Sequence, residues 1–248
     1  MANPATPVLQ PAEETSISRQ PESSGKVLVR ERSIWTDERP IRLLNITVAS
    51  VGFVVTLPLW VVIAIAIKLT SRGPLFYTQI RVGLDQRGLP QPADRSRRSE
   101  DIGGKPFVIV KFRTMTVDAE RQGEAVWAAA NDQRITAVGG FLRSCRLDEL
   151  PQLLNVLRGD MNLVGPRPER PQFVTQLREK IPDYQKRHRV RPGITGHAQV
   201  NLQYDTSVED VRRKVEHDLE YIARRTMWED LKIMLKTIPV MLFRKGGW

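Results

Sequence analysis

The chain has 248 residues, 41% of them hydrophobic and 27% charged, so it can bury a core and is neither wholly disordered nor collagen-like. Its single cysteine excludes an intramolecular disulfide framework, and its three histidines, His188, His197 and His217, are scattered, which predicts no histidine-based metal centre. The net charge of +10 predicts a polyanionic partner: nucleic acid, anionic lipid or a phosphorylated substrate.

The N-terminal part predicts a polar tail followed by a membrane segment. Residues 1–33 are rich in Pro, Ser and Glu without apolar periodicity, which is typical of a disordered tail, here cytoplasmic. The run from Leu43 to Ile67 carries no formal charge. As a helix it would be about 37 Å long, enough to cross a hydrocarbon core of about 30 Å. We therefore predict a membrane element over residues 34–72.

Basic residues flank the uncharged run on both sides, with Arg39 and Arg42 before it and Lys68 and Arg72 after it. Because positive charge favours the cytoplasmic side, both ends are expected on that side, and Pro58 is expected to kink the helix. From these features alone, two arrangements are equally compatible. One is a re-entrant hairpin that enters and leaves by the same leaflet, and the other is a simple spanning anchor with a tolerated proline.

The rest of the chain, residues 73–248, predicts a small domain of helices with little sheet. Polar residues with several prolines and glycines predict a surface loop, and a run of apolar residues predicts a strand. Apolar residues at helical spacing predict a short amphipathic helix, a core-facing helix, and a last helix that lies in the membrane interface or in the core. The loop covers residues 84–104 and the strand lies within residues 105–115. The amphipathic helix covers residues 147–157, the core-facing helix residues 208–222 and the last helix residues 228–248.

The pair Asp148 and Glu149 is the first candidate for chemistry. Pro151 is tolerated only in the first turn of a helix, so a helix is expected to start close to these two carboxylates. There a divalent cation could bridge a carboxylate to a phosphate. Taken alone, such a pair is more typical of a helix cap than of a catalytic site.

Basic residues surround this pair in excess of what two carboxylates need, and a bound polyphosphate would explain the surplus. Arg167 lies between two prolines, which either aim its guanidinium at a phosphate or make an ordinary rigid turn. The glycines that follow Arg191 either form a turn or let a nucleotide approach the backbone. The basic residues are Lys111, Arg113, Arg143, Arg146, Arg158, Arg167 and Arg170.

The strings KFRTM, LDELPQLLNVLRGDMNLVGPRPER and RVRPGITGHAQV, in this order after an apolar segment, resemble the bacterial sugar transferases, or monotopic phosphoglycosyl transferases. The resemblance covers roughly residues 40–243. It implies transfer of a sugar-1-phosphate from a UDP-sugar to a polyprenol phosphate, which the resemblance alone identifies as undecaprenyl phosphate, with release of UMP. That reaction would be the first membrane step of exopolysaccharide, O-antigen or other glycoconjugate synthesis.

The resemblance also implies site residues and a location. Asp148 would be the nucleophile that forms a covalent phosphosugar intermediate, and Glu149 would bind Mg²⁺. The re-entrant helix is favoured, in the bacterial inner membrane with the catalytic domain on the cytoplasmic face, and an oligomer is compatible. The residues assigned to substrate binding are Lys111, Arg113, Arg143, Arg146, Arg167 and Arg191.

The chain departs from the family pattern at several positions. Asn45 stands where an aspartate is common, Leu57 precedes Pro58 where a serine is common, and His197 stands where a tryptophan is frequent. The prediction is therefore an α+β, mostly helical, monotopic membrane enzyme with interfacial helices and no nucleic-acid partner. Two rivals are a basic nucleic-acid-binding protein without a membrane segment and a noncatalytic membrane scaffold whose Asp148-Glu149 pair only caps a helix.

Overall fold

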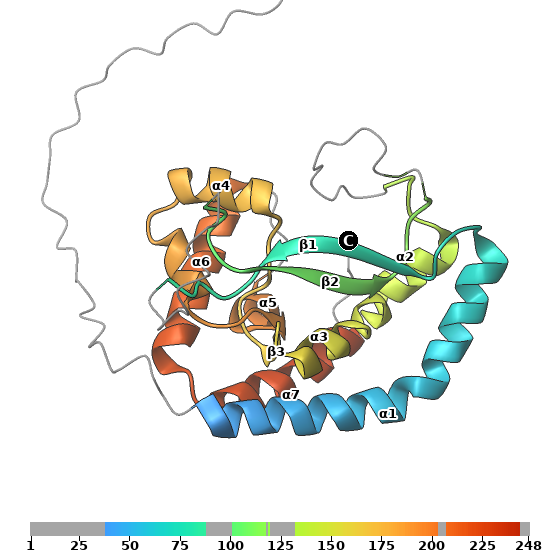
Figure 1. Ribbon diagram of the computed structural model, residues 1–248, viewed down its shortest axis with the longest axis horizontal. Coiled ribbons are helices and arrows are strands. Elements are labelled where there is room, and N and C mark those ends of the chain that lie inside the picture. The colour runs from blue at the N-terminus through green and yellow to red at the C-terminus, as the bar shows by residue number, and fades with distance from the viewer. Residues whose placement is uncertain (1–37, 88–100, 118, 120–131, 203–206, 244–248) are drawn as a thin grey trace, which may run out of the picture. The chain divides into compact units, whose positions relative to one another are not determined.

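The computed structural model describes residues 38–87, 101–117, 119, 132–202 and 207–243. All of them lie in one compact unit, Arg32–Trp248, and the predicted tail and most of the predicted loop lie outside the described residues. The described part is mixed α/β and mostly helical, as predicted (Figure 1). Its elements are α1 (Glu38–Thr70), β1 (Phe76–Val82), β2 (Pro106–Phe112), α2 (Ala137–Ser144), η2 (Leu147–Glu149), α3 (Gln152–Arg158), β3 (Asn162–Val164), α4 (Pro171–Lys180), η3 (Tyr184–Arg189), β4 (Gly193–Thr195), α5 (His197–Asn201), α6 (Val208–Arg224) and α7 (Met227–Phe243).

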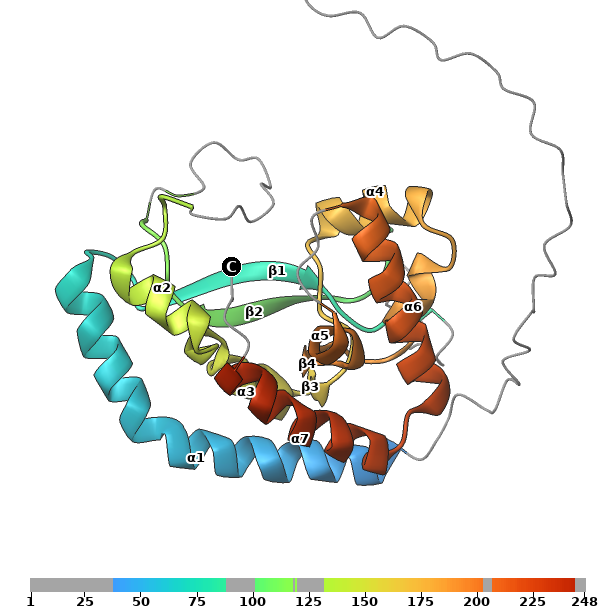
Figure 2. The same ribbon diagram turned by 180° about the vertical axis from the view of Figure 1, so that it is seen from behind.

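Helix α1 is long and apolar enough to cross a membrane, and most of its apolar side chains are exposed. It is one continuous helix that bends along its length (Figures 1 and 2). Pro58 lies inside it, and an internal proline is the usual cause of a kink because it removes a backbone hydrogen bond. The bend lets the two halves of α1 pack on different parts of the same domain.

The N-terminal half of α1 is attached by polar contacts. The Arg42 guanidinium donates to the carbonyls of Val156 and Leu157 at 2.6 and 2.8 Å. Asn45 is 2% exposed; its amide donates to the Ile41 carbonyl at 2.7 Å and accepts from the Leu163 amide. An amide side chain both donates and accepts, whereas an ionised aspartate only accepts. This use of both functions gives a physical role to the asparagine that departs from the family pattern.

The C-terminal half of α1 is held by apolar packing and by a buried arginine. Ile63 and Ile67 form a cluster with Phe112 of β2 and Leu142 of α2. Downstream of the helix, Arg113 donates to the backbone carbonyls of residues 71 and 72, at 2.8 Å each. Both ends of α1 are therefore tied to the same folded domain.

The two sheets are small. Strands β1 and β2 pair antiparallel, with Phe76 opposite Phe112, which confirms the predicted strand. Strands β3 and β4 pair parallel, and glycines at their ends allow a very close approach. A Cβ on Gly193 would lie 2.1 Å from the Gly165 nitrogen, and one on Gly165 would lie 2.4 Å from the Arg191 carbonyl oxygen. Backbone occupies the space beside these glycines, so they serve strand packing.

The predicted helices are confirmed with adjusted bounds. The predicted 147–157 helix is a short 3₁₀ turn followed by α3, and the predicted 208–222 helix is α6, whose Ser207 and Asp210 form a capping box. The last predicted helix is α7, which packs beside α1 (Figures 1 and 2). Trp228 and Leu235 of α7 are 66% and 60% exposed, which suits a helix that faces lipid.

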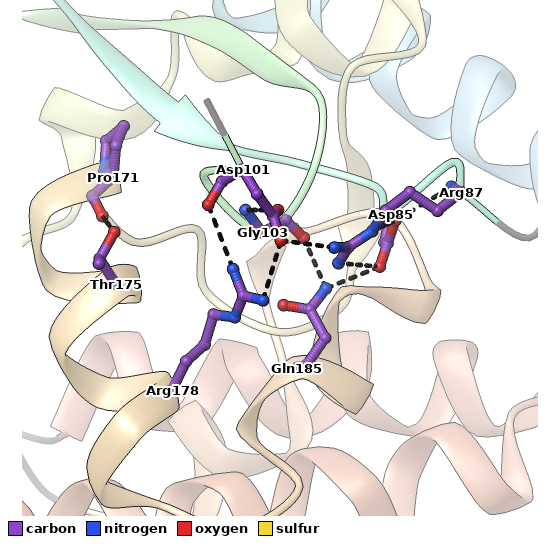
Figure 3. Close-up of polar contacts among 8 residues, drawn as sticks. All are labelled: Asp85, Arg87, Asp101, Gly103, Pro171, Thr175, Arg178 and Gln185. Atoms are coloured by element: carbon purple, nitrogen blue, oxygen red, sulfur yellow. Dashed lines mark hydrogen bonds and ion pairs between the residues drawn. The ribbon is translucent and has the colours of Figure 1, made fainter. Parts of the chain in front are cut away.

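A polar clasp joins the two ends of the predicted 84–104 loop (Figure 3). Arg87 binds Asp85 and Asp101, each at 2.7 Å. Arg178 of α4 contacts Asp101 at 3.1 Å, and Gln185 of η3 donates to Asp85 at 2.7 Å. The segment between the two ends lies outside the described residues, but its entry and exit are anchored to α4 and η3.

Candidate active site

The two carboxylates predicted for chemistry lie in η2, directly before α3. Arg146 precedes them in the left-handed conformation, with φ at 58°, which is strained for a residue with a side chain and turns the chain into η2. Asp148 is 6% exposed and Glu149 is 5% exposed. An exposed helix cap would leave its carboxylate in water, so this depth of burial calls for charged partners.

Two cations from distant parts of the chain supply that charge. Lys111 of β2 lies 2.7 Å from Glu149 Oε1 and 3.9 Å from Asp148 Oδ2. Arg167, from the proline-bounded segment after β3, donates to the same Glu149 oxygen at 2.7 Å. The backbone carbonyl of Arg167 in turn accepts a hydrogen bond from Arg187 at 3.1 Å. Glu149 therefore contacts two cations directly, whereas Asp148 lies near one cation, Lys111, at a longer distance.

The two carboxylates differ in their pKa values as a consequence. Burial raises the pKa of Asp148, and its neighbour Glu149 raises it further, against the lowering effect of Lys111. Burial also acts to raise the pKa of Glu149, but Arg167 and Lys111 outweigh it and hold that pKa well below its usual range. Burial lowers the pKa of Lys111, and the negative charge of Glu149 acts against this lowering. Glu149 is thus the firmly ionised member of the pair.

Two more of the predicted basic residues lie near the pair. The charge of Arg143 lowers the pKa of Asp148, and the charge of Arg146 lowers the pKa of Glu149. Arg143 extends from the last turn of α2 and donates to the Thr114 hydroxyl at 2.9 Å. Four predicted basic residues therefore surround the carboxylates, as a site for a polyphosphate requires.

The remaining two predicted binding residues have other partners. Arg113 is 5% exposed and is bonded to the backbone that follows α1, as described above. Arg191 donates to the Gly159 carbonyl at 3.1 Å and to the Glu38 carboxylate at 2.5 Å. Both fasten the ends of α1 to the domain and lie apart from the contacts of the dyad, so their binding to substrate stays a prediction.

Asn155 is a positioning residue that the sequence reasoning did not single out. It is fully buried in α3; its amide donates to the Val108 carbonyl at 2.7 Å and accepts from the Val110 amide at 3.2 Å. These bonds fix α3 and its preceding η2 turn against β2, the strand that carries Lys111. A polar residue within the apolar string LLNVL was the available signal.

The carboxylate pair fits a Mg²⁺ ion by the chemistry of its donors. Mg²⁺ prefers oxygen ligands and is usually held by one or two carboxylates together with substrate phosphates. Asp148 and Glu149 offer such oxygens from neighbouring positions of η2. The four basic residues around them exceed the two carboxylates in charge, so the negative charge of a diphosphate can also be neutralised.

Comparison with known proteins places these features in a family. The family model described as bacterial sugar transferase matches residues 37–244. The UDP-N-acetylgalactosamine-undecaprenyl-phosphate N-acetylgalactosaminephosphotransferase of Aeromonas hydrophila is 42% identical over 83% of this chain and 44% of its own length. Two proteins named UDP-glucose:undecaprenyl-phosphate glucose-1-phosphate transferase, from Klebsiella pneumoniae and Caulobacter vibrioides, are 42% and 41% identical. They match 79% and 81% of this chain, and 39% and 69% of their own lengths.

The chain spans less than half the length of the first two of these relatives. The family match nevertheless covers the long apolar helix α1, the Asp148-Glu149 pair and both small sheets. The resemblance seen in the sequence strings is confirmed, and the chain belongs to the bacterial sugar transferase family.

Proposed function

We propose that this chain transfers a sugar-1-phosphate from a UDP-sugar to undecaprenyl phosphate and releases UMP, as an early step of exopolysaccharide or other glycoconjugate synthesis. The observation that carries the proposal is the buried Asp148-Glu149 pair, held among Lys111, Arg143 and Arg167. A helix cap needs neither this burial nor these cations. The names of the relatives support the substrate class.

Asp148 is the proposed nucleophile. A carboxylate oxygen attacks the phosphorus next to the sugar, a new O–P bond forms, and the bond from that phosphorus to the bridging oxygen breaks, so that UMP leaves with the electron pair. The phosphate oxygen of the lipid then attacks the same phosphorus and releases Asp148 as a carboxylate. One site thereby serves a water-soluble donor and a membrane-bound acceptor in turn.

Glu149 is the proposed ligand of Mg²⁺. When bound, the ion would neutralise the diphosphate and support the leaving of UMP. The low pKa of Glu149 keeps this carboxylate ionised and ready to bind a cation. Lys111 and Arg167, which hold Glu149 in the absence of substrate, are proposed to turn to the phosphate oxygens.

The membrane helix is proposed to be re-entrant, on the cytoplasmic face of the bacterial inner membrane. Both ends of α1 contact the same domain, since Arg42 near its start binds the Val156 carbonyl and Arg113 binds the backbone carbonyls of residues 71 and 72 just after its end. A straight span would put these ends on opposite sides of the bilayer. The bend in α1 and the basic flanks support entry and exit through one leaflet.

The test is an assay of UMP release by detergent-purified protein given undecaprenyl phosphate and a panel of UDP-sugars. The panel includes UDP-glucose and UDP-N-acetylgalactosamine, the donors in the relatives' names. We expect one donor to be active, EDTA to abolish turnover and Mg²⁺ to restore it. No release with any donor, for protein that is folded by circular dichroism, would favour a noncatalytic scaffold.

A further inference from the structure

Two histidines and a glutamate meet between α5 and α6. His197 begins α5, while His217 and Glu220 lie three residues apart on α6, a spacing that places both on one helix face. The imidazole rings have centroids 5.3 Å apart, and one ligand atom from each of the three residues lies within 4.8 Å of the others. The histidines are scattered along the sequence, but the fold brings His197 and His217 together.

The distances within this cluster do not match hydrogen bonds. Glu220 Oε2 lies 3.4 Å from His197 Nε2 and 3.9 Å from His217 Nδ1. Direct N–H···O bonds are about 2.7–3.2 Å long. Ligand atoms bound to one tetrahedral zinc ion at about 2.0–2.1 Å are about 3.3 Å apart. One of these two distances matches that spacing, and all three ligand atoms lie within 4.8 Å of one another, so a small closure of the side chains would let them share one ion.

Two further observations on His217 and Glu220 indicate a ligand at the same place. His217 Nδ1 is buried and has no hydrogen-bond partner, which is unusual for a polar atom away from water. The other oxygen of Glu220, Oε1, is held by Arg224 at 2.7 Å, which fixes the carboxylate and leaves Oε2 directed at the histidines. Glu220 is 48% exposed at its side chain, so an ion can reach the cluster from solvent.

We propose that His197, His217 and Glu220 bind a divalent transition-metal ion, best matched by Zn²⁺, that fastens α5 to α6. Two imidazole nitrogens and one carboxylate oxygen are ligands that suit zinc, whereas Mg²⁺ prefers oxygen alone. The site is therefore distinct in chemistry and in residues from the carboxylates of η2. A water molecule would complete four-coordination.

The experiment is zinc binding by calorimetry to purified full-length protein that carries no polyhistidine tag and has been stripped with a chelator. We expect one Zn²⁺ per chain, and a rise in the midpoint of thermal unfolding of about 5–10 °C at a hundredfold excess over Kd. Co²⁺ in place of Zn²⁺ should give the visible absorption of a tetrahedral site. None of these readouts needs a sugar donor, so the result is independent of transferase activity.

Variants separate this site from adventitious binding. The double variant His197→Ala/His217→Ala should lose at least the 10–100-fold in affinity typical of weakened metal sites. Glu220→Gln, which preserves shape, should also weaken binding, whereas Glu216→Gln, an exposed acid on the same helix, should leave it unchanged. Absence of saturable binding to the wild type, or equal affinity in the double variant, would overturn the proposal.

Discussion

At the scale of single residues, the two neighbouring carboxylates of η2 differ because their cations are shared unequally. Arg167 and Lys111 both contact one oxygen of Glu149 at 2.7 Å, while Lys111 reaches Asp148 only at 3.9 Å. A carboxylate engaged by two cations is a poorer nucleophile than one that keeps its lone pairs. This difference supports the proposal that Asp148 attacks phosphorus and that Glu149 serves charge neutralisation.

Asp148→Asn is expected to fold and remain in the membrane fraction but to form no covalent phosphosugar adduct, because an amide oxygen is a poor nucleophile at phosphorus. Glu149→Gln should instead slow both adduct formation and its discharge, and should raise the Mg²⁺ requirement. Intact-protein mass spectrometry after exposure to donor without acceptor measures the adduct. A wild-type adduct level on Asp148→Asn would mean that the nucleophile is another residue.

Asp230 of α7 predicts a pH-dependent stability. Burial raises its pKa from 3.8 to about 6, although Tyr221 donates a 2.6 Å hydrogen bond to it. A raised carboxyl pKa contributes stability that is fully present below the unfolded value and is lost as pH rises through about 6. Relative to Asp230→Asn, the wild type should lose up to about 3 kcal/mol between pH 4 and pH 7. Denaturant unfolding of both proteins across this range measures it, and parallel pH profiles would contradict it.

At the scale of elements, α1 is the part whose position decides the topology. Its exposed apolar residues suit lipid, and its two ends contact one domain through Arg42 and Arg113. This arrangement supports the proposal that α1 enters and leaves the bilayer on the same side. The physical means is the internal Pro58, which removes one backbone bond of the helix.

Cysteines at Arg39 and Arg72, exposed positions near the two ends of α1, test this topology in a Cys145→Ser background. A membrane-impermeant maleimide should label both in inside-out vesicles and neither in spheroplasts, since both flanks are basic. A cysteine at position 55 serves as the control, because Val55 is a 71% exposed apolar residue of the same helix. It should remain unlabelled in both preparations, since lipid is expected to cover it. Labelling of the two ends from opposite sides would exclude the re-entrant arrangement.

At the scale of the whole molecule, one buried ion pair connects the core to the site. Arg187 of η3 binds Asp218 of α6 at 2.7 Å, with side chains 1% and 3% exposed. Arg187 also donates to the carbonyl of Arg167, the residue that contacts Glu149. Loss of one partner would leave the other charge buried and would loosen the support of the site.

Asp218→Ala is expected to cost about 3–5 kcal/mol in the free energy of unfolding, because it leaves Arg187 buried without its carboxylate. The double variant Arg187→Met/Asp218→Leu should recover most of this loss, since it buries no charge. Thermal or denaturant unfolding in detergent measures both. A single variant as stable as the wild type would show that water reaches Arg187.

The sequence by itself determined the features that follow from local rules. Charge and hydropathy located α1 and its basic flanks, Pro151 located the start of the helix behind the dyad, and the helical spacing of apolar residues located α6. Three sequence strings were enough to identify the family. Such features depend on residues within a few positions of one another, so no knowledge of packing is needed to read them.

Only the tertiary structure decided which distant residues meet. Lys111 and Glu149 are 38 residues apart in the chain, and the pairing of β2 with its neighbours brings Lys111, rather than Arg113, to the carboxylates. Likewise, the packing of α5 on α6 joins His197 to His217. Residues 111 and 113 would share one face of a regular strand, but β2 ends at Phe112 and Arg113 turns to the backbone that follows α1. Local patterns contain no information about that choice.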